Sequence, residues 1–162
     1  MIDSSASLER VQRIFSNDRF ATETTGCRVV EAGPGHAVCE LDVCERHLNE
    51  KGGVMGGAIF TLADFACAVA SNIGEEPTVS VAFSIQYLSA VKGKRLIAMA
   101  DARKTVGRSG FTTAWCATTS GATSHTSRAP ACTPRRARRR LKTHARCRLA
   151  TGGQGRLRLL LQ

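Results

Sequence analysis

Apolar and polar residues alternate with two different periods along the first two thirds of the chain. Near the start, Leu8, Val11 and Ile14 follow Ser7 at helical spacing, which predicts a short helix with a serine cap. Residues 27–43 contain two strand-like runs separated by a Gly-Pro-Gly turn. This second pattern is typical of a β-hairpin.

A long apolar run comes next and predicts the central helix of the protein. It covers residues 55–72 and is followed by Gly74 and Pro77, which are common just after helix ends. Residues 78–91 and 95–107 then alternate with period two, and a further strand candidate starts at position 108. The order of a helix, a hairpin, a long helix and successive strands predicts an α+β fold.

The charge of the chain is distributed unevenly. The first 113 residues hold all 13 acidic residues and 12 of the 23 basic ones, whereas residues 114–162 hold 11 basic residues and no acid. From about position 118 the sequence has no sustained period and is dominated by Arg, Ala, Thr, Gly and Pro, a low-complexity composition. We therefore predict one domain over residues 1–117 and an aberrant or disordered basic tail over residues 118–162.

Two origins of this tail remain open. It is either a natural basic tail or the product of a GC-rich gene that is translated out of frame. In both cases the strand that starts near position 108 soon loses its alternation, so we hypothesise that the sheet lacks its last strand or strands. An incomplete sheet leaves backbone groups unpaired, and we expect poor folding or weak activity from such a chain.

Composition excludes several broad classes of protein. No apolar run approaches the roughly 20 residues that cross a bilayer, and the first residues do not resemble a signal peptide. The seven cysteines are odd in number and form no CxxC pair, which disfavours a disulfide framework or a zinc site. We predict a cytoplasmic protein with no membrane partner, no metal site, and reduced, mostly buried cysteines.

One carboxylate, Asp64, lies in the middle of the apolar helix. It follows Gly57 by seven residues, close to two helical turns, so both lie on one face of the helix. The first-turn amides lack intrahelical acceptors and carry partial positive charge, and the absence of side chains at Gly56 and Gly57 lets a ligand carbonyl approach them. An amide that polarises a carbonyl, together with a carboxylate base, is suited to acyl transfer. Close helix packing and an exposed aspartate would explain the same pattern.

The segment "HLNEKGGVMGGAIFTLADFA" resembles a family signature. It is similar to that of the hotdog-fold acyl-CoA thioesterases of the phenylacetic acid degradation (PaaI) family, in the 4-hydroxybenzoyl-CoA thioesterase superfamily. That signature is roughly N-x-x-G-x-x-H-G-G, with Asp or Glu seven residues after the second glycine. The resemblance extends over about residues 8–113 and implies an antiparallel sheet wrapped around a long central helix. The matching residues are Asn49, Gly52, Gly56, Gly57 and Asp64.

The resemblance implies hydrolysis of an acyl-CoA to the free acid and coenzyme A, with an aromatic acyl group such as phenylacetyl or a medium-length chain. Asp64 would be the general base or the nucleophile, and the Gly57 amide would polarise the thioester carbonyl. Asn49 would orient the water or the carboxylate, and Ser80 matches a position where some relatives carry a hydroxyl near the water. No cofactor is implied, because coenzyme A is part of the substrate. The family assembles as homodimers or homotetramers, and each site takes groups from two subunits.

The chain departs from the signature at Met55, where relatives usually have the histidine before the two glycines. That histidine is thought to position the thioester or the helix start, so we expect Met55 to change the rate or the substrate preference. His47 lies eight residues earlier. We predict that it is a core or loop histidine and does not replace the missing one.

Further residues are candidates for substrate binding. Lys92, Lys94 and Arg108 lie in turns and at strand ends, where they could bind the phosphates of coenzyme A, and Arg108 resembles a recurrent family position. Gly56 and Met55 would contact the thioester end of the substrate. The acyl pocket is expected to include apolar residues of the helix and the facing strands: Phe60, Phe65 and Phe83.

Three other functions are compatible with parts of this sequence to different degrees. A non-catalytic acyl-CoA-binding hotdog domain is the main alternative and is motivated by Met55. A nucleic-acid binder could use the basic run "PRRARRRLK", but a single Trp and a single Tyr argue against a stacking surface. A hotdog dehydratase is disfavoured, because those enzymes usually pair a histidine with the acid.

Overall fold

The computed structural model describes residues 1–106, 109–119 and 156–161. The chain divides into two units, residues 1–121 with 155–162 and residues 122–154, and the second unit lies outside the described residues. The helical elements are α1 (Leu8–Phe15), the π-helix η1 (Phe20–Thr25), the 3-10 helix η2 (Glu45–His47) and α2 (Gly56–Asn72). The strands are β1 (Arg28–Gly33), β2 (His36–Asp42), β3 (Phe83–Gln86), β4 (Arg95–Val106), β5 (Ser109–Thr119) and β6 (Arg156–Leu161).

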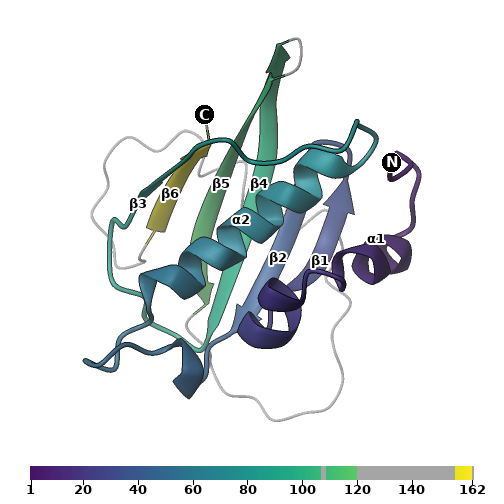
Figure 1. Ribbon diagram of the computed structural model, residues 1–162. Coiled ribbons are helices and arrows are strands. Elements are labelled where there is room, and N and C mark those ends of the chain that lie inside the picture. Colours follow the sequence, from purple (N-terminus) through teal and green to yellow (C-terminus); the bar gives the residue numbers. More distant parts are fainter. Residues whose placement is uncertain (107–108, 120–155, 162) are drawn as a thin grey trace. The chain divides into compact units, whose positions relative to one another are not determined.

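The six strands form one antiparallel sheet in the order β1-β2-β4-β5-β6-β3. Helix α2 lies along one face of this sheet and contacts β1, β2, β4 and β5 (Figure 1). The predicted α+β class is confirmed, and so is the arrangement of an antiparallel sheet around a long central helix. Three expected elements, the capped first helix, the hairpin and the strand over residues 95–107, appear as α1, as β1 with β2, and as β4.

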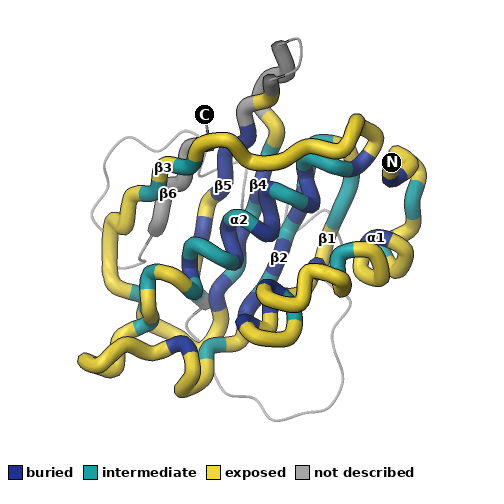
Figure 2. The backbone as a smooth tube through the Cα atoms, viewed as in Figure 1, coloured by how far each residue is buried: buried dark blue, intermediate teal, exposed yellow. Residues whose placement is uncertain are grey.

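Helix α2 packs closely on the sheet because the facing side chains are small. Its buried residues include Leu62, Ala66 and Val69, and Figure 2 shows buried positions along the strands beneath it. The buried strand positions opposite are mostly alanine and cysteine, which leave room for the helix backbone. They are Ala37, Cys39, Ala98, Ala100, Ala114 and Cys116. No helix in the described residues is both long enough and apolar enough to cross a membrane.

The described cysteines are free thiols. Cys27, Cys39, Cys67 and Cys116 are buried, and burial raises the pKa of each thiol, so these side chains act as small apolar core residues. Cys44 is exposed. The prediction of reduced, mostly buried cysteines is confirmed for these five, while Cys132 and Cys147 lie outside the described residues.

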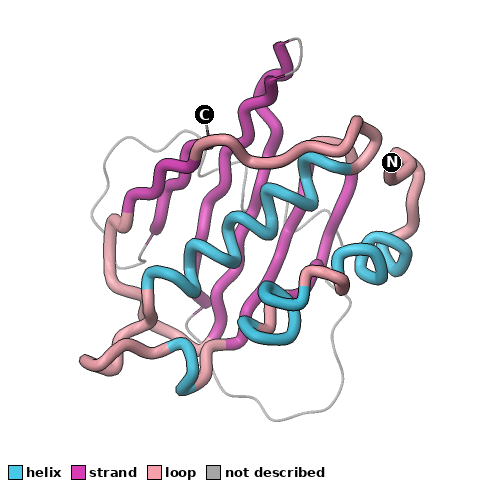
Figure 3. The backbone as a smooth tube through the Cα atoms, viewed as in Figure 1, coloured by secondary structure: helices cyan, strands magenta, loops and turns pink. Residues whose placement is uncertain are grey.

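The alternating segment after α2 forms a shorter strand than its pattern predicts. Only Phe83–Gln86 is a strand, and residues 74–82 form the loop that leads to it in Figure 3. Val79 and Val81 are 87% and 94% exposed. An extended segment becomes a strand only where another strand accepts its hydrogen bonds, and among the described residues β3 pairs on one side alone, with β6. The segment therefore leaves an open sheet edge flanked by exposed valines.

The last strand, β6, comes from a part of the sequence that we assigned to the basic tail. Residues 156–161 pair with both β5 and β3, so the expected gap at the end of the sheet is filled. In its sequence, "RLRLLL", polar and apolar residues alternate over only the first four positions, a run too short to indicate a strand in a segment rich in arginine. Strand β5 also continues to Thr119. The boundary at residue 117 and the origin of the tail remain predictions.

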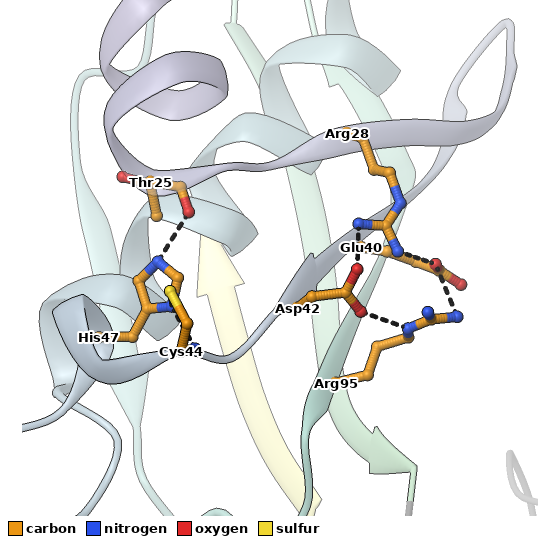
Figure 4. A network of polar contacts seen from close by, with 7 residues as sticks. All are labelled: Thr25, Arg28, Glu40, Asp42, Cys44, His47 and Arg95. Atoms are coloured by element: carbon orange, nitrogen blue, oxygen red, sulfur yellow. Dashed lines mark hydrogen bonds and ion pairs between the residues drawn. The ribbon is translucent and has the colours of Figure 1, made fainter. Parts of the chain in front are cut away.

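Ion pairs between side chains link β1, β2 and β4 (Figure 4): Arg28 of β1 and Arg95 of β4 both pair with acidic residues of β2. Arg28 bonds Glu40 at 2.9 Å and Asp42 at 2.8 Å, and Arg95 bonds Asp42 at 2.7 Å. Partial burial acts to raise the pKa of Asp42, but the bonds from Arg28 and Arg95 outweigh it and lower that pKa. These pairs are partly exposed, so they fix strand register more than they add stability.

Candidate functional site

Asp64 lies in the middle of α2 and is half-buried. The pKa of its carboxyl group is raised, chiefly by burial and also by the negative charge of Asp18. Ser80, in the loop between α2 and β3, donates a hydrogen bond to Asp64 Oδ1 at 3.4 Å, which acts to lower that pKa. The structure therefore brings together two of the predicted site residues and gives the carboxylate an environment that strengthens it as a base.

An open cavity of about 330 Å³ lies beside Asp64. Part of its wall comes from residues 18–21, around the start of η1, and no feature of the sequence indicated that this segment lies near Asp64. Asp18 in this segment accepts a hydrogen bond from the Ala21 amide at 3.1 Å, and this bond supports the turn into η1. The lining residues are Asp18, Phe20, Ala21, Phe60, Thr61, Asp64 and Phe65.

The three phenylalanines predicted for the acyl pocket are divided between the cavity and the core. Phe60 and Phe65 line the cavity. Phe65 is also a core residue, since it is 2% exposed and its ring meets Phe15 edge to face at 5.9 Å. Phe83 packs on Phe60 with ring centroids 4.7 Å apart, but it does not line the cavity. Phe20 is a lining residue that the sequence did not indicate.

The start of α2 presents the other half of the predicted chemistry. Met55 is the N-cap, Gly56 and Gly57 are the first two helical residues, and backbone bonds to the Met55 carbonyl begin with the amide of Ala58. The Gly57 amide has no acceptor among the described residues. It is also about 10 Å from Asp64 along the helix axis, at 1.5 Å per residue. A carbonyl group bonded to the Gly57 amide would therefore lie well away from the Asp64 position of the same helix.

Asn49 organises the loop that leads into α2. Its side-chain oxygen accepts hydrogen bonds from the amides of Lys51 and Gly53, both at 3.0 Å. The backbone amide of Asn49 donates a hydrogen bond to the Gly53 carbonyl at 2.7 Å. The side chain therefore has a clear role in shaping this loop, while its predicted role in orienting water or the carboxylate remains a prediction.

His47 fixes the same loop to the rest of the domain (Figure 4). The ring is buried, its Nε2 donates to the Thr25 carbonyl at 2.8 Å, and its Nδ1 accepts from the Cys44 amide at 3.0 Å. The His47 carbonyl accepts a hydrogen bond from the Met55 amide at 2.7 Å. The ring nitrogens are thus used in holding η2 against η1, which confirms the prediction of a core or loop histidine.

The predicted phosphate ligands are only partly described. Lys92 and Lys94 are exposed in the turn before β4, and neither forms an ion pair with another described residue. Arg108 lies outside the described residues. Binding of coenzyme A by these three residues therefore remains a prediction.

Several proteins that this chain resembles in sequence or in structure are named as esterases or thioesterases. The chain is 34% identical over 95 residues to human acyl-coenzyme A thioesterase 13, which is 57% of this chain and 68% of that protein. It is 37% identical over 98 residues to a protein from Archaeoglobus fulgidus whose name suggests an esterase. That match covers 59% of this chain and 63% of the relative, so the chain spans less than two thirds of the length of that protein. No family model matches the chain.

Solved structures of thioesterases share the fold. Zebra fish thioesterase superfamily member 2 superposes with a TM-score of 0.62 at 26% identity, over 97% of this chain and 98% of that one. The E. coli PaaI protein of the phenylacetic acid degradation operon gives the same TM-score of 0.62 at 18% identity, over 95% and 93% of the two chains. The second likeness shows the fold alone and does not single out the phenylacetic acid degradation family.

Proposed function

This chain belongs to the family of acyl-coenzyme A thioesterase 13, and from that membership we propose that it hydrolyses acyl-CoA to a free acid and coenzyme A. One observation carries the proposal. Asp64 is a half-buried carboxylate with a raised pKa, beside a cavity walled partly by aromatic rings, and the Gly57 amide in the first turn of its helix has no acceptor in the described part of the chain. A base and an oxyanion donor are the two groups that thioester hydrolysis requires.

The proposed reaction begins with a water molecule near Asp64. As the water oxygen attacks the thioester carbon, Asp64 takes its proton, and the carbonyl oxygen becomes an oxyanion that accepts a hydrogen bond from the Gly57 amide. The tetrahedral intermediate then collapses, the carbon–sulfur bond breaks, and the thiolate of coenzyme A leaves and is protonated. Direct attack by Asp64, with hydrolysis of the resulting anhydride, uses the same two groups.

We propose that the site is shared between two copies of the chain. Within one chain, Gly57 and Asp64 are separated by about 10 Å along the helix axis, which favours a thioester held between Gly57 of one copy and Asp64 of another. Two α2 helices packed side by side in opposite directions would place Gly57 of one copy near Asp64 of the other. Where the structure describes the chain, β3 pairs only with β6, and its other edge, with the exposed Val79 and Val81, supports a homodimer joined there; a homotetramer would be a pair of such dimers.

The cavity favours an aromatic or medium-chain acyl group. Phe20, Phe60 and Phe65 provide apolar walls, and its volume of about 330 Å³ is at the lower end of the range typical of ligand pockets. Phenylacetyl-CoA is one candidate of this class. Lys92, Lys94 and Arg108 would bind the phosphates of coenzyme A, and a cytoplasmic location is part of the proposal.

The proposal is tested by measuring thioester hydrolysis with a thiol-trapping reagent. The substrates are phenylacetyl-CoA, benzoyl-CoA and straight-chain acyl-CoAs of increasing length. We expect turnover with an aromatic or medium-chain substrate. Tight binding without any turnover by a folded protein would instead support the non-catalytic acyl-CoA-binding domain.

Replacing Ser80 by alanine should change the pH dependence of turnover. The substitution removes the hydrogen bond that lowers the pKa of Asp64, so this pKa is expected to rise further above its ordinary value. A general base acts only when deprotonated, and the acidic limb of kcat/KM should therefore move to higher pH, with little change in kcat well above the limb. Ser84→Ala, at an exposed position of β3, is the matched control. A limb that stays in place or moves to lower pH would contradict the assignment.

A further inference from the structure

Tyr87 connects the end of β3 to the first peptide group of α2. Its hydroxyl donates a hydrogen bond to the carbonyl oxygen of Gly56 at 3.0 Å. The Gly56 carbonyl and the Gly57 amide belong to the same planar peptide group. The tyrosine hydroxyl therefore lies at one end of the peptide whose other end is the proposed oxyanion donor.

The close contact between Tyr87 and Gly56 also depends on the glycine. A Cβ atom at position 56 would lie 3.0 Å from the Tyr87 hydroxyl oxygen and 3.1 Å from Cζ of the ring. Both distances are shorter than ordinary van der Waals contacts, so any other residue at position 56 would push the ring away. Glycine at this position is explained by the approach of Tyr87 at least as well as by the approach of a ligand.

We propose that Tyr87 is a positioning residue for thioester hydrolysis, which holds and polarises the Gly56–Gly57 peptide so that the Gly57 amide is a stronger and better-oriented donor. The inference rests on the proposed function and adds a residue that the family signature does not include. A carbonyl oxygen has two lone pairs, so Gly56 can accept from Tyr87 as well as within the helix. Each hydrogen bond in such a chain strengthens the next by about 10–30%.

The protonation state of Tyr87 is compatible with this role. Burial of the ring, with a smaller contribution from Cys116, raises the pKa of its hydroxyl above the ordinary value. The group therefore stays protonated and remains a donor throughout the neutral range. Tyr87 is 49% exposed, so water competes for the hydrogen bond and the expected effect is moderate.

Tyr87→Phe removes the hydroxyl and keeps the ring. With the best acyl-CoA substrate, we expect kcat to fall about two- to sevenfold, because the variant loses only the strengthening of the Gly57 donor and not the donor itself, while KM stays within about twofold. The thermal midpoint should change little, because the ring packing is retained. Leu88→Ala, at the neighbouring exposed position, controls for general disturbance of this segment.

A spectroscopic measurement separates polarisation from a structural role. The infrared band of the thioester carbonyl is recorded for an acyl-CoA bound to Asp64→Asn and to Asp64→Asn with Tyr87→Phe. The hydroxyl should shift the band to lower frequency, so the second protein should show a smaller shift. Equal kcat values, or equal bands, in the presence and absence of the hydroxyl would overturn the inference while leaving the proposed function intact. A wild-type protein that neither hydrolyses nor binds any acyl-CoA would overturn both.

Discussion

Asp64→Asn is expected to reduce kcat for the best acyl-CoA substrate by about 100- to 10,000-fold, the range typical for loss of a general base. Asparagine has nearly the same size and can still accept a hydrogen bond from Ser80, so the helix and the cavity should remain in place. An amide cannot take a proton from water at neutral pH. The fall should therefore appear in kcat, with a much smaller change in KM.

The measurement is thioester hydrolysis under single-turnover and steady-state conditions, with circular dichroism to verify the fold. Glu23→Gln removes one negative charge from an exposed position of η1 and is the matched control, expected to retain wild-type turnover. If Asp64→Asn kept more than about a tenth of the wild-type kcat, a general-base role would not be consistent with the expected loss. Asp64 would then have a structural role in the helix.

Gly57→Pro should reduce kcat by about 100- to 1,000-fold, because proline lacks the amide hydrogen that we propose as the oxyanion donor. The position allows this unusual test. Gly57 is the second residue of α2, and proline is tolerated in the first turn of a helix, where the amides make no intrahelical bond. A Cβ atom at position 57 would meet only the flexible end of Met55, at 3.3 Å from its Cε.

Gly57→Ala provides the comparison for this substitution. Alanine adds a methyl group at the same place but retains the amide, so a much smaller loss is expected, mainly as a higher KM. Equal losses of kcat in the two variants would mean that the added carbon atoms, and not the missing amide, are responsible. That result would remove Gly57 from the proposed mechanism while leaving the role of Asp64 untouched.

Local sequence signals were enough to predict the elements that combine a long apolar or periodic pattern with clear end signals. Helix α2 begins one residue after the predicted start, at Gly56, and ends at Asn72 as predicted. The serine cap of α1 is also present, because Ser7 accepts a hydrogen bond from the Arg10 amide. Such signals are local, since each is made by residues a few positions apart.

The elements that the sequence predicted poorly are those that depend on a distant partner. Residues 78–82 alternate as a strand would, but they lie in a loop because no strand among the described residues pairs with them. Strand β6 is the opposite case, because its sequence did not predict a strand. Residues 156–161 form one by pairing with β5 and β3, although their region has a low-complexity composition. Whether an extended segment becomes a strand is decided by its neighbour in space.

The same division applies to the candidate site. The sequence by itself determined the helix, the acid within it and the two glycines at its start, because helical geometry places residues seven positions apart on one face. Only the tertiary structure decided that Ser80 bonds Asp64, that Asp18 and Phe20 line the cavity, and that Tyr87 reaches Gly56. These contacts join residues from separate elements. They form only when burial of the apolar face of α2 against the sheet brings the connecting loops together.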